Sequence, residues 1–132
     1  PVRHVLPYVA ARCAGAFLAS GTLRLLFPDS ATLGATLPAG TAIQSFIFEV
    51  ILTLMLMFVA LSVATGAKER GLMAGVAVGG VVALEALFAG PVCGASMNPA
   101  RSLAPAVVSG HLEHLWVYMS APVAGAVCAV FL

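Results

Sequence analysis

The amino-acid sequence predicts an all-α membrane protein in which four membrane-spanning helices surround one re-entrant half-helix. Hydrophobic residues make up 61% of the 132 residues and charged residues only 8%, whereas soluble domains usually contain about 25% charged residues. Each of the long apolar runs approaches or exceeds the ~17–25 residues that a spanning helix needs. A formal net charge of +1 argues against nucleic-acid binding.

The predicted spans follow one another along the chain and are separated by more polar links. They comprise residues 5–26, 43–65, 72–89 and 115–132. We interpret residues 1–132 as one transmembrane domain. Because Pro1 is no initiator and Leu132 falls inside an apolar run, we expect this domain to be part of a longer protein.

The positive residues of the links predict how the chain is oriented. Arg3 precedes the first span, and Lys68 and Arg70 lie in the link between the second and third spans. The long link of residues 27–41 contains neither lysine nor arginine. Because cytoplasmic links are enriched in positive residues, we expect Arg3, Lys68 and Arg70 in the cytosol and residues 27–41 outside.

A short helix is predicted between the last two spans. Asn98 is a favoured N-cap residue, and Pro99 suits the first helical position because its missing N–H costs nothing there. The helix comprises residues 99–108 and stops close to Gly110; its ~15 Å is about half of a ~30 Å hydrocarbon core. We expect a re-entrant helix whose positive N-terminus, with Arg101 in the first turn, lies near the membrane midplane.

The start of this helix carries a motif that extends beyond a capping signal. The chain there reads Gly94-Ala95-Ser96-Met97-Asn98-Pro99-Ala100-Arg101-Ser102. This stretch resembles the second signature loop of the aquaporin (major intrinsic protein) family, and residues 88–103 resemble that of its plant nodulin-26-like branch. The resemblance covers essentially the whole chain, as helices three to six of that fold. It implies an aquaporin-like helical bundle, a homotetramer in the lipid bilayer, and the plant plasma membrane or an endomembrane.

The resemblance also implies the functional residues. The pore signature corresponds to Asn98, Pro99 and Ala100. Three of the four selectivity-filter positions correspond to Ala86, Ala95 and Arg101, and the fourth would come from the missing half together with the other signature loop.

Glu49 matches a family glutamate that accepts hydrogen bonds from the backbone of the re-entrant loop. The physical argument agrees with this role, because an irregular loop at membrane depth needs hydrogen-bond acceptors.

Three further charged residues fall inside predicted spans. Arg24 lies near the end of a helix, so we expect its long side chain to reach the interface, and Arg12 is expected to reach the cytosolic interface in the same way. The related family usually has Gln in place of Arg12. Glu85 stands where Asn is common in the nodulin-26-like branch, and no role follows for it from the sequence.

No cofactor or metal site is predicted. Cys13, Cys93 and Cys128 are scattered through apolar stretches without a paired spacing. His111 and His114 share a short link, but zinc binding would require further ligands.

These observations predict a passive channel for water or small uncharged solutes. The positive end of the half-helix and Arg101 repel protons and cations. Ala86 and Ala95 are both small, which favours a wide constriction suited to glycerol or to boric, silicic or arsenous acid.

Two alternatives remain open at this stage. A secondary transporter also uses broken helices and buried carboxylates such as Glu49 and Glu85. The second alternative is a non-conducting membrane fragment that only packs against partners. An enzyme is not expected, because Ser96 has no general base in the sequence to activate it.

Overall fold

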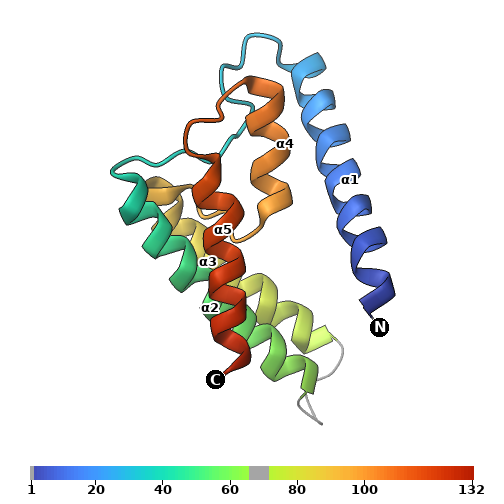
Figure 1. Ribbon diagram of the computed structural model, residues 1–132, viewed down its shortest axis with the longest axis vertical. Coiled ribbons are helices and arrows are strands. Elements are labelled where there is room, and N and C mark those ends of the chain that lie inside the picture. Colours follow the sequence, from blue (N-terminus) through green and yellow to red (C-terminus); the bar gives the residue numbers. More distant parts are fainter. Residues whose placement is uncertain (1, 66–71) are drawn as a thin grey trace.

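The computed structural model describes residues 2–65 and 72–132, and this part of the chain is helical without any strand. A 3-10 helix, η1 (Val2–His4), precedes five α-helices (Figure 1). These are α1 (Val5–Leu26), α2 (Ala42–Thr65), α3 (Leu72–Cys93), α4 (Pro99–Ser109) and α5 (Leu115–Val130). The all-α prediction is confirmed. Lys68 and Arg70, on which the predicted orientation partly rests, lie outside the described residues.

Helix α3 is longer than the sequence predicts. It continues beyond Ala89 to Cys93 and includes Pro91. Proline removes one backbone N–H and its ring crowds the carbonyl four residues earlier, yet α3 continues for two residues beyond Pro91. The helix ends instead at Gly94, which has a left-handed φ of 85° and donates its N–H to the Gly90 carbonyl at 2.9 Å.

Within the described residues, three helical stretches are long and apolar enough to cross a membrane. They are η1 with α1 (Val2–Leu26), α2 (Ala42–Thr65) and α3 from Met73 to Cys93. Helix α5 is equally apolar but has 16 residues, or ~24 Å at 1.5 Å per residue. It is therefore shorter than the predicted span of residues 115–132. That α5 crosses the membrane remains a prediction.

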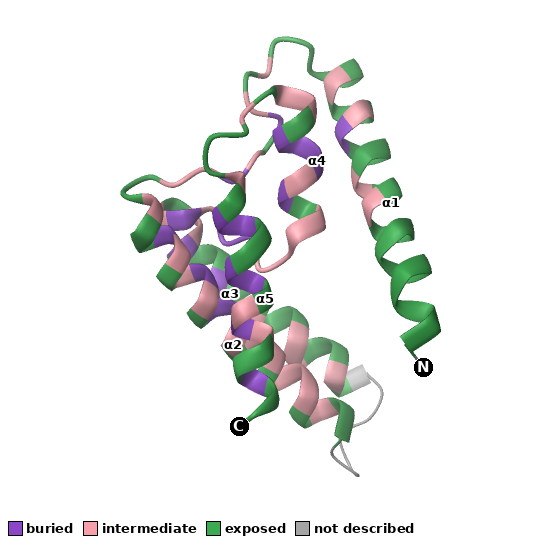
Figure 2. Cartoon of the chain, viewed as in Figure 1, coloured by how far each residue is buried: buried purple, intermediate pink, exposed green. Residues whose placement is uncertain are grey.

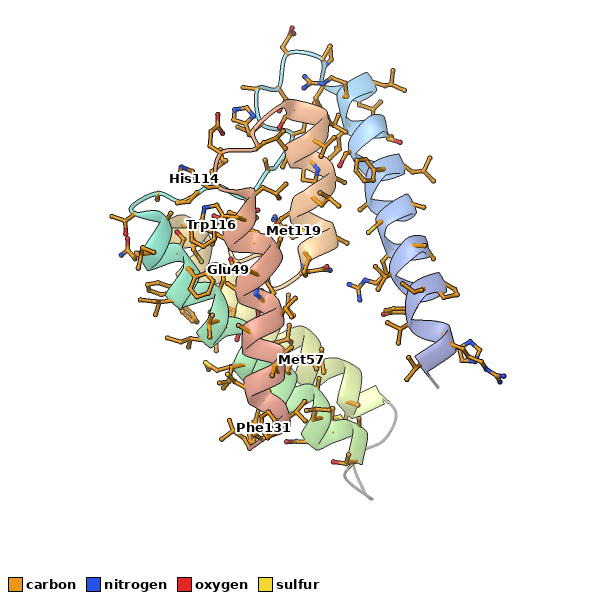
Figure 3. All side chains as sticks on the ribbon, in the orientation of Figure 1. Glu49, Met57, His114, Trp116, Met119 and Phe131 are labelled. Carbon is orange, nitrogen blue, oxygen red and sulfur yellow. The ribbon has the colours of Figure 1, made fainter. Side chains whose placement is uncertain are left out.

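The helices pack as two groups joined through α4. Helix α2 packs against both α3 and α5, whereas α1 packs against α4, which in turn contacts α5 (Figure 1). Phe46 of α2 stacks on Trp116 of α5 with ring centroids 5.8 Å apart (Figure 3). Gly125 of α5 lies so close to α2 that an added Cβ would come within 2.4 Å of the Val50 carbonyl oxygen. The α2–α5 contact therefore depends on a residue without a side chain.

The small residues of α1 and α3 do not serve the same purpose in the described structure. An added Cβ on Gly15, Gly75 or Gly79 would meet no atom within 4 Å. Close helix packing at a glycine is therefore found at Gly125 of α5 and not at these positions of α1 and α3. Helix α1 packs against α4, and its one buried residue is Ser20.

Buried residues concentrate around the segment that links α3 to α4 (Figure 2). A hydrophobic cluster of Leu52, Ala89, Cys93 and Ala95, with Phe48 and Met97 packed against it, supports this segment. Helix α4 begins about midway along the molecule and runs toward the end that carries residues 27–41 (Figure 1). The N-terminus of α1 and the C-terminus of α5 lie at the opposite end (Figure 1). The fold thus places the start of α4 about midway between the two ends of the molecule.

Candidate functional site

The start of α4 follows from its capping residues. Asn98 is the N-cap, with φ −155° and ψ 110°, and its Oδ1 accepts the N–H of Ala100 at 3.1 Å. Pro99 occupies the first turn, where no N–H is missed. Because Oδ1 must face that N–H, the Asn98 amide nitrogen is turned the other way. It makes no hydrogen bond within the described part of the chain, so it can donate to a solute.

Glu49 of α2 holds the signature loop, which we define as residues 94–98. Its Oε1 accepts the N–H of Ser96 at 2.7 Å, and its Oε2 accepts the N–H of Met97 at 2.8 Å. The side chain is fully buried among the helices (Figure 3). Hydrogen bonds to an ionised acceptor are about twice as strong as neutral ones. The structure thus places Glu49 against the loop that the sequence assigned to it.

The signature loop needs this support because its backbone is strained. Gly94, Ala95 and Met97 have left-handed φ values of 85°, 42° and 52°, and such a conformation costs a non-glycine residue about 1–3 kcal/mol. Gly94 is required for a second reason. A Cβ there would lie 3.1 Å from Cβ of Thr36, which packs directly against it.

Thr36 belongs to the outer loop, which we define as residues 27–41, and it reaches the signature loop through buried hydroxyls. Its Oγ1 donates to Ser102 Oγ at 2.6 Å, and Ser102 is hydrogen-bonded to Ser96. Ser96 Oγ in turn donates to the Asn98 carbonyl at 3.0 Å. All three hydroxyl-bearing residues are buried. Sequence reasoning missed Thr36, although a loop of this length is often functional.

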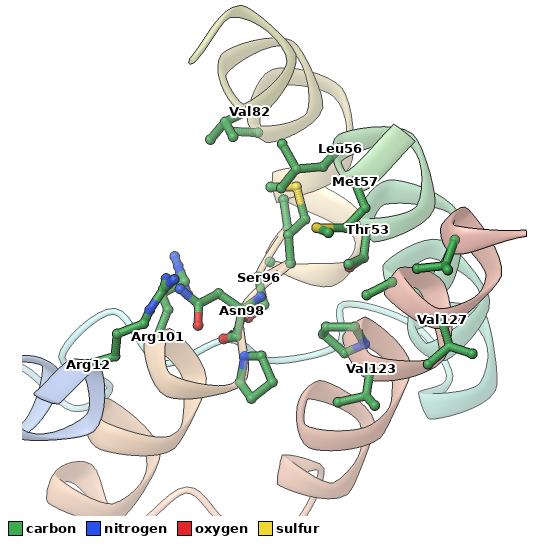
Figure 4. Close-up of a pocket in the computed structure, with 18 residues that line it drawn as sticks. Arg12, Thr53, Leu56, Met57, Val82, Ser96, Asn98, Arg101, Val123 and Val127 are labelled. Carbon is green, nitrogen blue, oxygen red and sulfur yellow. Dashed lines mark hydrogen bonds between the residues drawn. The ribbon is translucent and has the colours of Figure 1, made fainter. Parts of the chain in front are cut away.

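The start of α4 faces a cavity of about 870 Å³ that extends between α2, α3 and α5 (Figure 4). A second cavity, of about 430 Å³, lies between α1 and α4. Of the residues assigned from the sequence, the first cavity is lined by Ala86, Ala95, Asn98, Pro99 and Arg101, so both small filter candidates and the arginine meet in one space. Ala100, the third residue of the pore signature, lines the second cavity. Asn98 and Arg101 line this cavity as well.

Arg24 makes its hydrogen bonds at the C-terminal end of α1, and that its side chain reaches the membrane interface stays a prediction. Its guanidinium donates to the carbonyls of Pro28, Ser30 and Val108, at 3.2, 3.1 and 3.3 Å. The last of these carbonyls belongs to the C-terminal turn of α4, where helix carbonyls lack helical partners. Arg24 thus ties the end of α1 to the outer loop and to α4.

Glu85 is fully buried in α3, and neither of its carboxylate oxygens has a hydrogen-bond partner in the described part of the chain. The structure gives no account of this residue. The described residues also contain no group of three or more His, Cys, Asp and Glu side chains that could hold a metal ion.

Comparison with known proteins places these features in a family context. A sequence profile described as Major intrinsic protein matches residues 1–132. Among curated proteins, Nodulin-26 of Glycine max is 48% identical over 99% of this chain, which covers 49% of that protein. Aquaporin NIP1-1 of Oryza sativa subsp. japonica is 50% identical over 99% of this chain, covering 46% of that protein. Aquaporin NIP1-2 of Arabidopsis thaliana is 45% identical over 96%, again covering 46%. The chain therefore spans about half the length of the curated relatives that it matches.

Proposed function

The chain belongs to the major intrinsic protein family, and on that premise we propose that it forms one half of a passive channel for water and small uncharged solutes. Members of this family are membrane channels rather than enzymes. The observation that carries the proposal is the start of α4, where Asn98 and Arg101 face the cavity of about 870 Å³ that Ala86 and Ala95 also line.

The proposed selectivity follows from electrostatics and hydrogen bonding. The N-terminus of α4 carries a partial positive charge, and Arg101 adds a full one in the first turn. Both disfavour the entry of a proton or cation. A neutral solute meets no such barrier, and the free amide of Asn98 and the Arg101 guanidinium replace hydrogen bonds that the solute loses with its water.

The class of solute is proposed from the size of the filter side chains. Ala86 and Ala95 each contribute a single methyl group to the cavity. Such a constriction suits molecules wider than water, and we propose glycerol or the neutral acids of boron, silicon or arsenic. Water would pass as well.

The assembly and location are proposed from the relatives. The other walls of the pathway, including the other Asn-Pro-Ala loop and the fourth filter residue, would come from the half of the relatives that this chain does not span. The proposed assembly is a homotetramer in the lipid bilayer. Because the relatives named above are plant proteins, the proposed location is a plant plasma membrane or endomembrane.

One observation favours a second candidate, a secondary transporter. Buried ionisable residues inside membrane helices often mark coupling sites, and Glu85 is buried without a partner in the described structure. A carrier would saturate with solute and would follow an ion gradient, whereas a channel would do neither.

The full-length protein in liposomes decides between these functions. Stopped-flow light scattering would measure water, glycerol and boric acid flux across a range of solute concentrations, with and without a proton gradient. The channel proposal predicts flux that rises linearly with solute and ignores the gradient. Saturating, gradient-dependent flux would support the transporter, and flux equal to that of empty liposomes would support a non-conducting protein.

A further inference from the structure

Arg12 is a charged residue of α1 that the proposed function has not yet used. It lies on the face of α1 that also carries Ala16, Ala19 and Leu23, and this face lines the cavity between α1 and α4. Arg12 lines the larger cavity as well, together with Asn98 and Arg101. Figure 4 shows its side chain extending from α1 toward Arg101 and Asn98. Two guanidinium groups from different helices therefore reach the same space.

The contacts of Arg12 leave most of its donors and its charge available to this space. Its Nη1 donates to the hydroxyl of Tyr8 at 3.0 Å, and its guanidinium carbon lies 5.5 Å from the centroid of the Tyr8 ring. Tyrosine is a neutral partner, so these contacts orient the guanidinium without neutralising it. The carboxylate of Glu49 is occupied elsewhere, since each of its oxygens accepts a backbone N–H of the signature loop.

We infer that Arg12 is a second charge-selectivity residue of the pathway. This inference rests on the proposed channel function and deepens it. A permeating cation would meet fixed positive charge from α1 as well as from α4, and like charges repel. A neutral solute would be unaffected by the additional charge. Cation exclusion would then depend on two arginines and not on Arg101 alone.

The test separates the charge of Arg12 from its size. In the full-length protein, Arg12→Gln and Arg12→Met remove the charge, whereas Arg12→Lys keeps it. Arg3→Gln is the matched control, because Arg3 is exposed in η1 and lines neither cavity. Water flux and the leak of protons and potassium ions would be measured on the same liposomes. We expect both neutral variants to raise the cation leak about 3- to 10-fold, as a barrier change on the order of 1 kcal/mol would do.

The control Arg3→Gln should keep the water flux and the leak of the unmodified protein, and Arg12→Lys should leak no more than that protein. Because the barriers add as free energies, combining Arg12→Gln with Arg101→Val should multiply the two leak factors. Equal leaks for Arg12→Lys and Arg12→Gln, or no increase with Gln and Met, would overturn the inference while leaving the channel intact. Absence of water flux in the unmodified protein would instead overturn the proposed function, and this inference with it.

Discussion

The signature loop and helix α1 are held in contrasting ways. The loop is fixed from three directions, by Glu49 from α2, by the hydrophobic cluster beneath it and by Thr36 from the outer loop. Helix α1 packs against α4 and buries only Ser20. The contrast shows that contacts within this chain determine the geometry of the signature loop. The surfaces of α1 contribute less to the stability of the described structure, so substitutions in the two regions should differ in effect.

The largest effect is expected at Glu49. Glu49→Gln keeps the shape but replaces one acceptor oxygen with an NH₂ group that faces a backbone N–H. Losing a charged acceptor in a buried site should cost about 2–4 kcal/mol. Thermal unfolding of the full-length protein in detergent would measure this loss. Glu113→Gln, at an exposed position in the link before α5, is the control and should unfold like the unmodified protein. Equal unfolding temperatures for the two variants would refute the supporting role of Glu49.

Two glycines compare the packing of α1 with that of α5. Gly125→Ala places a methyl group against the α2 backbone, and such overpacking typically costs about 1–3 kcal/mol. Gly15→Ala on α1 meets no neighbour within 4 Å and gains helix propensity of up to ~1 kcal/mol. The same unfolding assay should therefore show opposite signs. Destabilisation by Gly15→Ala that matches that of Gly125→Ala would mean that α1 packs as tightly as α5.

A smaller effect is expected where the outer loop meets the signature loop. Thr36→Val keeps the packing against Gly94 but removes the hydroxyl that donates to Ser102, at a cost of about 1 kcal/mol. Thr36→Ser keeps the hydroxyl and should largely restore stability. Thr65→Val, at an exposed helix end, serves as the control. Identical unfolding temperatures for the Val and Ser variants at position 36 would show that the hydroxyl chain contributes nothing.

How much of this site could be predicted from the sequence depends on how local each interaction is. The start of α4 was predictable because Asn98 and Pro99 act on the next two residues. Glu49 was predictable because it matches a family glutamate that supports this loop, and because an irregular loop at membrane depth needs acceptors. Thr36 was not, because its partner Ser102 lies 66 residues away and no periodicity connects them. The contact between Arg24 and Val108 was not predictable for the same reason, since this carbonyl of α4 lies 84 residues away and only the fold brings it within reach.

The smallest effect on stability is expected for a substitution that changes the width of the constriction. Both regions should remain folded. Ala86→Ile adds three carbon atoms at an exposed position that lines the larger cavity. It should lower glycerol and boric acid flux more than water flux. A tenfold fall in the ratio of solute flux to water flux corresponds to ~1.4 kcal/mol of barrier. Swelling of liposomes that contain the full-length protein would give this ratio. An unchanged ratio would remove Ala86 from the filter.

The most direct test of the proposed channel is cation leak through the full-length Asn98→Asp variant. Aspartate caps a helix as well as asparagine does, so Oδ1 can still accept the N–H of Ala100 and the fold should persist. The amide donor is replaced by a negative charge at the positive end of α4. We predict a potassium and proton leak at least about tenfold higher, the equivalent of ~1.4 kcal/mol, with reduced flux of neutral solutes. A folded variant with unchanged leak and unchanged neutral flux would contradict the account.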